Sequence, residues 1–109
     1  MSQDNQRSHV RIHYPPARRP TLQLDGREYP VLDLSAEGLL FLLPPDAAPP
    51  TLGGRLEGTL RLRSCPPVAV RARIVWVEDD RVGLHLWPDA IPYSVLLSEE
   101  RSLAANRGA

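Results

Sequence analysis

The chain has 109 residues, of which 42% are hydrophobic and 24% are charged, and its formal net charge at pH 7 is zero. This length and composition are those of one soluble globular domain with a single core. Because the net charge is zero, no global field attracts nucleic acid or an anionic membrane, so any anion-binding site must be local.

Six short strands are predicted between turn signals, because apolar and polar residues alternate over most of them. They cover about residues 19–24, 28–35, 39–43, 55–63, 68–76 and 81–87. Asp25-Gly26, Gly38 and Asp79-Asp80 mark turns, and the prolines of residues 44–50 mark a loop. This pattern indicates an all-β antiparallel barrel or sandwich. Since side chains fill the interior of a small barrel, a ligand would have to bind outside it.

Side-chain directions follow from the alternation along each strand. In the second strand, Leu32 and Leu34 are expected on one face, and Asp33 and Ser35 on the other. Five consecutive apolar residues, 39–43, predict a strand that is buried on both faces. The inward residues of the next two strands are expected to be Leu56, Gly58, Leu60 and Leu62, and then Val68, Val70, Ala72, Ile74 and Trp76.

The two ends of the chain are predicted to differ from the barrel. Residues 1–18 lack a regular apolar period and contain Tyr14-Pro15-Pro16, which favours extended backbone, so we interpret them as a flexible N-terminal arm. The barrel domain is expected over residues 19–109, and it includes a short C-terminal α-helix over residues 89–105. The expected packing residues of this helix are Ile91, Val95, Leu96 and Leu103. Glu99-Glu100 is expected on its solvated face.

Three features of the composition bear on the location of the protein. Cys65 is the only cysteine, so no intrachain disulfide can form, and a cytoplasmic protein is expected. The N-terminus is polar, without an apolar signal segment, and residues 39–43, the longest apolar run, are too short to cross a bilayer. All 13 basic residues are arginine; a coding bias is the favoured explanation, a role in phosphate binding is compatible with it, and the composition alone does not decide between them.

Asp33, Ser35 and Gly38 form the first candidate binding motif, at the end of the second strand. A carboxylate can accept hydrogen bonds from the N1–H and exocyclic amine of guanine, and a hydroxyl can donate to a base nitrogen or a phosphate oxygen. Gly38 lets the backbone turn or approach a ligand closely. Considered alone, the motif is better explained as a strand-to-turn junction, in which Asp and Ser bond to local backbone.

Arg7 and Arg11, four residues apart on the arm, form the second candidate motif. If the arm folds back over an anionic purine nucleotide, the two guanidiniums can hold its phosphates and cover a base. Considered alone, they are better explained as solvated charge on a terminal tail. The order and joint occurrence of the two motifs favour the binding interpretation.

Together, the RxxxR motif at residues 7–11 and the DxSxxG motif at residues 33–38 resemble those of the PilZ domain, a bacterial receptor module for cyclic di-GMP. The resemblance covers almost the whole chain. Arg81-Val82-Gly83-Leu84-His85-Leu86 is similar to the last strand of the family, Ile74-Val75-Trp76-Val77 to the strand before it, and a C-terminal helix follows. The resemblance implies a six-stranded antiparallel β-barrel.

The resemblance also implies the roles of five residues. Arg7 and Arg11 are similar to the arginines that clamp the phosphates and cover a guanine. Asp33 and Ser35 are similar to the residues that read the other guanine edge, and Gly38 to the glycine that shapes the turn. Cyclic di-GMP is thus the expected ligand.

One position departs from the fuller family motif. Many members have another arginine directly before RxxxR, and Gln6 stands at that place here. In the family this arginine is associated with a stacked ligand dimer. We therefore expect one cyclic di-GMP per site, and weaker affinity is a second expected consequence of the missing charge.

Other reactive side chains indicate neither a metal nor a catalytic site. His9 and His13 have no cysteines or acids at ligand spacing and are interpreted as arm residues, with His9 a candidate to stack on a base. Trp76 is either a contact beside the ligand or a core anchor. Cys65 has no evident base to activate it. We expect no cofactor, no metal and no enzymatic activity.

The leading hypothesis is a ligand-responsive adaptor. Cyclic di-GMP binds, the arm becomes ordered, and a protein partner recognises the changed surface. No output domain accompanies the predicted barrel, so action through another chain is expected, in motility, polysaccharide export and biofilm formation, or another pathway. The alternatives are a PilZ-like interaction module without nucleotide and a barrel for single-stranded nucleic acid. Zero net charge and only 6% aromatic residues argue against the nucleic acid polymer.

Overall fold

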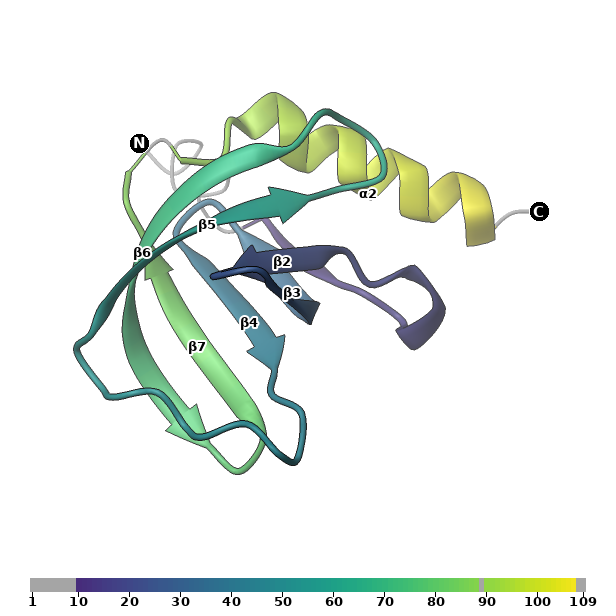
Figure 1. Ribbon diagram of the computed structural model, residues 1–109. Coiled ribbons are helices and arrows are strands. Elements are labelled where there is room, and N and C mark those ends of the chain that lie inside the picture. The colour runs from purple at the N-terminus through teal and green to yellow at the C-terminus, as the bar shows by residue number, and fades with distance from the viewer. Residues whose placement is uncertain (1–9, 89, 108–109) are drawn as a thin grey trace.

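Seven strands and a C-terminal helix form the part of the chain that the computed structural model describes, residues 10–88 and 90–107 (Figure 1). The strands are β1 Arg11–His13, β2 Thr21–Leu24, β3 Arg27–Ser35, β4 Gly38–Leu42, β5 Arg55–Arg61, β6 Val68–Glu78 and β7 Arg81–Leu86. The helix α2 spans Tyr93–Arg107, and a single 3-10 turn, η1, spans Pro16–Arg18.

The long strand β3 joins the sheet into a closed barrel. The strands are paired in the order β1-β3-β2-β5-β6-β7-β4, and a further pairing of β3 with β4 closes a ring of six antiparallel strands. The first part of β3 pairs with β2 and its last three residues pair with β1, while β4 runs along its other edge. The predicted six-stranded barrel is confirmed. The additional strand β1 lies within the residues predicted as an arm.

Apolar side chains from every strand of the ring fill the barrel interior. One fully or almost fully buried residue from each is Leu22, Val31, Phe41, Leu60, Ala72 and Val82. Leu96 of α2 belongs to the same core, so the helix packs across one end of the barrel (Figure 1). Because side chains occupy the interior, a ligand has to bind on the outer surface.

A β-bulge in β3 changes the predicted side-chain phase. The pairing of β3 with β4 shifts between Val31 and Asp33, and both Val31 and Leu34 are fully buried. Leu32 is only half-buried, so the prediction that Leu32 and Leu34 lie on one face is wrong. An extra residue at a bulge resets the alternation of a strand. Asp33 and Ser35 both follow the bulge, so the alternation still puts them on the same face of β3.

A second bulge, between Ile74 and Trp76 in β6, corrects another prediction. Val75 and Trp76 are 54% and 40% exposed, whereas Ile74 is buried. Trp76 therefore does not point into the core, and its interpretation as a core anchor is wrong. The physical reason is again the extra residue, which directs Trp76 to the outer face.

The strand β4 also differs from its prediction. Leu39 and Phe41 are buried, but Leu40 and Leu42 are only half-buried, so β4 is not buried on both faces. Its outer face is covered by no second layer among the described elements, since α2 packs at one end of the barrel instead (Figure 1). This uncovered face is part of the candidate site.

The helix α2 begins at Tyr93, later than the predicted residue 89. The Pro92 carbonyl accepts hydrogen bonds from the N–H groups of Val95 and Leu96, so the proline lies at the start of the helical hydrogen-bond ladder. Ile91 and Leu96 are buried as predicted. Within residues 10–88 and 90–107, no helix has the length and apolar character needed to span a membrane.

A buried polar cluster of Tyr14, Ser64 and Glu99 ties three parts of the fold together. The Tyr14 hydroxyl donates to Oε1 of Glu99 at 2.5 Å, and the Ser64 N–H donates to Oε2 at 3.3 Å, as does the Ser64 hydroxyl. Glu99 is 3% exposed, so the predicted solvated position is wrong for this residue, although Glu100 is exposed. Burial and the hydrogen bond to Glu99 raise the pKa of Tyr14 well above its usual range.

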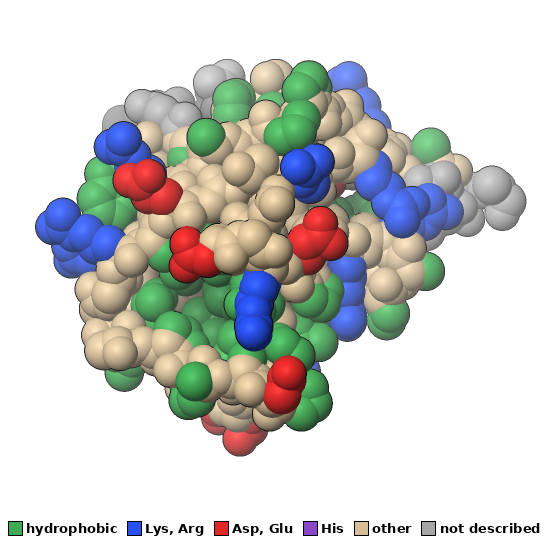
Figure 2. All heavy atoms as spheres, in the orientation of Figure 1, with side chains coloured by type: hydrophobic (Ala, Val, Ile, Leu, Met, Phe, Trp, Pro, Cys, Tyr) green, Lys and Arg blue, Asp and Glu red, His purple; other side chains and the backbone are tan. Residues whose placement is uncertain are grey.

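Acidic and basic side chains are interspersed on the face shown in Figure 2, around a hollow in which hydrophobic side chains are visible. No region of a single sign dominates this view, as the zero net charge suggests. Any anion-binding site must therefore be formed by a few residues.

Candidate functional site

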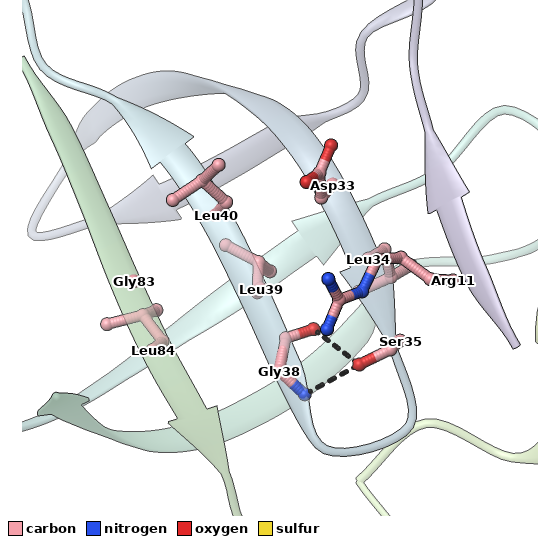
Figure 3. Close-up of a pocket in the computed structure, with 9 residues that line it drawn as sticks. All are labelled: Arg11, Asp33, Leu34, Ser35, Gly38, Leu39, Leu40, Gly83 and Leu84. Carbon is pink, nitrogen blue, oxygen red and sulfur yellow. Dashed lines mark hydrogen bonds between the residues drawn. The ribbon is translucent and has the colours of Figure 1, made fainter. Parts of the chain in front are cut away.

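An open pocket of about 220 Å³ lies on the outer face of the barrel, where β1, β3, β4 and β7 meet (Figure 3). Its lining residues are Arg11, Asp33, Leu34, Ser35, Gly38, Leu39, Leu40, Gly83 and Leu84. Polar groups from β1 and β3 thus stand beside the backbone of two glycines and a half-buried leucine on the neighbouring strands.

The register of β1 against β3 brings the two predicted motifs together. Arg11 lies opposite Ser35, and His13 lies opposite Asp33. Figure 3 shows the Arg11 guanidinium reaching from β1 across β3 toward Gly38. Four of the five predicted binding residues, Arg11, Asp33, Ser35 and Gly38, therefore line one pocket.

Two residues of the predicted site lie outside the described part of the chain. These are Arg7 and the candidate stacking residue His9. Gln6, on which the expected stoichiometry depends, lies there as well.

The turn between β3 and β4 is fixed by Ser35. Its hydroxyl oxygen accepts from the Gly38 N–H at 3.0 Å and lies 3.4 Å from the Gly38 carbonyl oxygen, to which the hydroxyl donates (Figure 3). This is the local bonding expected at a strand-to-turn junction. A Cβ at residue 38 would lie 3.4 Å from the Leu84 carbonyl oxygen, an ordinary contact, so the space around this residue does not by itself require glycine.

Asp33 does not bond to the local backbone but pairs with His13. The His13 Nδ1 lies 2.8 Å from Oδ1 of Asp33, and the two side chains are 73% and 26% exposed. His13 thus orients one carboxylate oxygen and leaves Oδ2 free of a protein partner among the described residues. Sequence reasoning treated His13 as an arm residue; the signal for its position is the two-residue spacing from Arg11, which puts both on one face of an extended strand.

Gly83 lines the pocket on the side away from β1, and Trp76 is the cross-strand partner of Gly83 on β6. Along one row of the sheet, Asp33 pairs with Leu40, Leu40 with Gly83, and Gly83 with Trp76. A Cβ on Gly83 would lie 3.2 Å from the Trp76 Cβ, so the glycine makes room for the indole on the outer face. Gly83 was not among the predicted site residues.

Cys65, the other side chain of potential reactivity, does not line this pocket. It is half-buried, and burial raises the pKa of its thiol. A thiol held in its neutral form is a poor nucleophile. The pocket itself contains charge, hydrogen-bonding groups and exposed backbone, which are suited to holding a polar anionic ligand.

The described chain is thus a small antiparallel barrel with a polar pocket on its outer face. A family model described as the PilZ domain matches residues 5–97, and the chain belongs to this family. Its members are in general cyclic di-GMP receptors and adaptors rather than enzymes. The crystal structure of an uncharacterized Legionella protein is similar in fold, with a TM-score of 0.61 and 16% identity, covering 91% of this chain and 98% of that one. No curated protein has significant sequence similarity to the chain.

Proposed function

We propose that this protein is a bacterial cyclic di-GMP receptor that acts as an adaptor for a protein effector. One observation supports this most strongly: Arg11 from the RxxxR motif and Asp33, Ser35 and Gly38 from the DxSxxG motif line a single pocket on the outer face. Neither motif is specific alone. Their meeting in space is what a shared ligand requires.

The chemistry of each group fits a guanine nucleotide. Arg11 and Arg7 hold the phosphates and cover one guanine through charge-assisted hydrogen bonds and stacking. The free Oδ2 of Asp33, and Oδ1 once His13 moves, accept from the guanine N1–H and amine. Ser35 donates to the ligand or keeps the turn in shape, and Gly38 leaves the backbone accessible.

Residues around the pocket add secondary contacts. Trp76 presents an exposed indole next to Gly83, and His9 is placed by the sequence between the two arginines. Both offer an aromatic surface to a base. Because Gln6 replaces the additional arginine, we propose one ligand per site.

Signalling follows from the location of Arg11 on β1. Because β1 already pairs with β3, binding fixes the part of the arm that precedes β1 over the ligand, at a cost of roughly 1–2 kcal/mol for each residue that becomes fixed. Arginine–phosphate pairs, guanine hydrogen bonds and stacking offset this cost. The altered surface then engages a protein effector, in a cytoplasmic pathway such as motility or biofilm control.

Alanine substitution tests the site assignment. Calorimetric titration with cyclic di-GMP should show at least about tenfold weaker binding for Arg7→Ala, Arg11→Ala and Asp33→Ala, since each removes a charge-assisted hydrogen bond. Arg61→Ala is the matched control, because Arg61 is exposed on β5 and contacts Gln23. Unchanged affinity in all three variants would refute the assignment, and absence of binding to the unaltered chain would favour a protein-interaction module without nucleotide.

A further inference from the structure

The strand β1 has two functional faces. Its exposure alternates along Arg11, Ile12, His13 and Tyr14: the first and third are exposed, and the second and fourth are buried. Arg11 lines the outer pocket and His13 pairs with Asp33, while Ile12 and Tyr14 face the core and α2. A three-residue strand cannot move one face without the other, since both belong to the same backbone.

The helix α2 packs against this strand as well as against the barrel core, to which Leu96 belongs. Among the described strands, β1 is the one against which α2 packs most extensively. Tyr14, the residue that follows β1, donates a hydrogen bond of 2.5 Å to Glu99 of α2, whose buried carboxylate also accepts from Ser64. A hydrogen bond to a buried charged group is costly to leave unmade, so displacement of Tyr14 must be followed by Glu99.

A groove leaves room for such a displacement. A cavity of about 470 Å³ lies between β1 and α2, lined by Arg11, Ile12 and His13 on one side and by Glu100, Arg101, Leu103 and Ala104 on the other. Arg11 borders both this groove and the ligand pocket. The helix is therefore held to β1 at the buried cluster and separated from it by open space farther along.

We propose that the Tyr14–Glu99 hydrogen bond transmits ligand binding from β1 to α2, which makes α2 the output element of the receptor. This inference rests on the proposed function. A ligand that draws Arg11 and His13 into the pocket shifts β1, and Tyr14 carries that shift to Glu99 through contiguous contacts. The two binding events are linked. If the ligand raises the affinity of the protein for a partner that recognises the shifted α2, the partner raises the affinity of the protein for the ligand by the same factor.

Hydrogen exchange of the full chain, with and without saturating cyclic di-GMP, tests the proposal. In the unaltered protein, the ligand should change the exchange of amides in residues 93–107 by about fivefold or more. Tyr14→Phe should bind cyclic di-GMP with an affinity within about threefold of the unaltered protein, because the hydroxyl is outside the pocket, but should lose the α2 response. The matched control is Tyr29→Phe, since Tyr29 packs against Phe41 rather than Glu99.

The outcomes separate the two claims. Absence of binding to the unaltered chain overturns the proposed function and this inference with it. Binding without an α2 response, or an α2 response that persists in Tyr14→Phe, overturns the inference alone. A merely structural role of the bond predicts faster basal exchange in Tyr14→Phe with the ligand effect intact. If Tyr14→Phe does not fold, Glu99→Gln, which keeps an acceptor oxygen but removes the charge, should weaken the response, and an undiminished response overturns the inference.

Discussion

The outer pocket and the buried cluster use polar side chains in opposite ways. In the pocket, Asp33 has one oxygen paired with an exposed histidine and another without a partner among the described residues, and Arg11 forms no ion pair within them. In the cluster, both oxygens of Glu99 accept hydrogen bonds and the carboxylate is almost inaccessible. Unused hydrogen-bonding capacity at an exposed position is suited to binding, whereas saturated capacity in the interior holds elements together. Substitutions in the cluster should therefore change stability, and those in the pocket should change binding.

The largest expected stability effect is that of Glu99→Ala. It leaves the Tyr14 hydroxyl and the Ser64 donors without their acceptor in a buried place, so the free energy of unfolding should fall by about 3 kcal/mol. Urea unfolding measures this free energy. Glu100→Ala, at the exposed neighbouring position, should change it by less than about 0.5 kcal/mol. Equal effects of the two variants would contradict the distinction between the regions.

Tyr14→Phe should have a smaller effect on the same measurement. It removes one donor and leaves Glu99 with Ser64, so a loss of about 1.5 kcal/mol is expected. A loss larger than that of Glu99→Ala would contradict this account, because Tyr14→Phe keeps the ring and removes only one of the donors to Glu99.

The pH dependence of unfolding gives a third test of the cluster. The folded-state pKa of Tyr14 is raised above its unfolded value of about 10, so this group contributes stability that is complete below that pH and is lost as the pH rises above it. The unaltered protein should lose stability above pH ~10 more steeply than Tyr14→Phe. Parallel curves would mean that Tyr14 ionises as readily in the folded state as in the unfolded chain.

These buried features could not be predicted from the sequence, for a physical reason. The turn at Asp25-Gly26 and the close placement of Asp33 and Ser35 depend on neighbouring residues, and local rules were sufficient for them. The pairing of β1 with β3 and the burial of Glu99 depend on contacts between residues 20 and 85 positions apart. Nothing in Glu99-Glu100 distinguishes the carboxylate that will meet Tyr14.

The side-chain directions at the two bulges were predicted wrongly for a related reason. The sequence of a single strand predicts regular alternation of its side chains between two faces. Only the pairing with a neighbouring strand shows where an extra residue is inserted. For Trp76 the partner is Gly83, whose missing side chain gives the indole space on the outer face. RxxxR and DxSxxG are identifiable as motifs, so the sequence could single out residues that line one pocket, whereas the positions of His13 and Gly83 beside it follow only from cross-strand register.

The smallest expected effect concerns His13 in the pocket. His13→Ala frees both oxygens of Asp33 for guanine, so the affinity for cyclic di-GMP should rise by no more than about threefold, with little change in stability, as for an exposed pair. Titration calorimetry and thermal unfolding measure the two quantities. Marked weakening of binding would instead make His13 a residue that orients Asp33 or touches the ligand.

The most direct test of the receptor assignment is isothermal titration calorimetry of the unaltered chain with cyclic di-GMP, with GTP as the control. We predict saturable binding of about one cyclic di-GMP per chain and no binding of GTP, because only the cyclic dinucleotide presents two guanines and two bridging phosphates to the same pocket. Two ligands per chain would contradict the expectation drawn from Gln6. Absence of both binding heat and a thermal shift would contradict the receptor function itself.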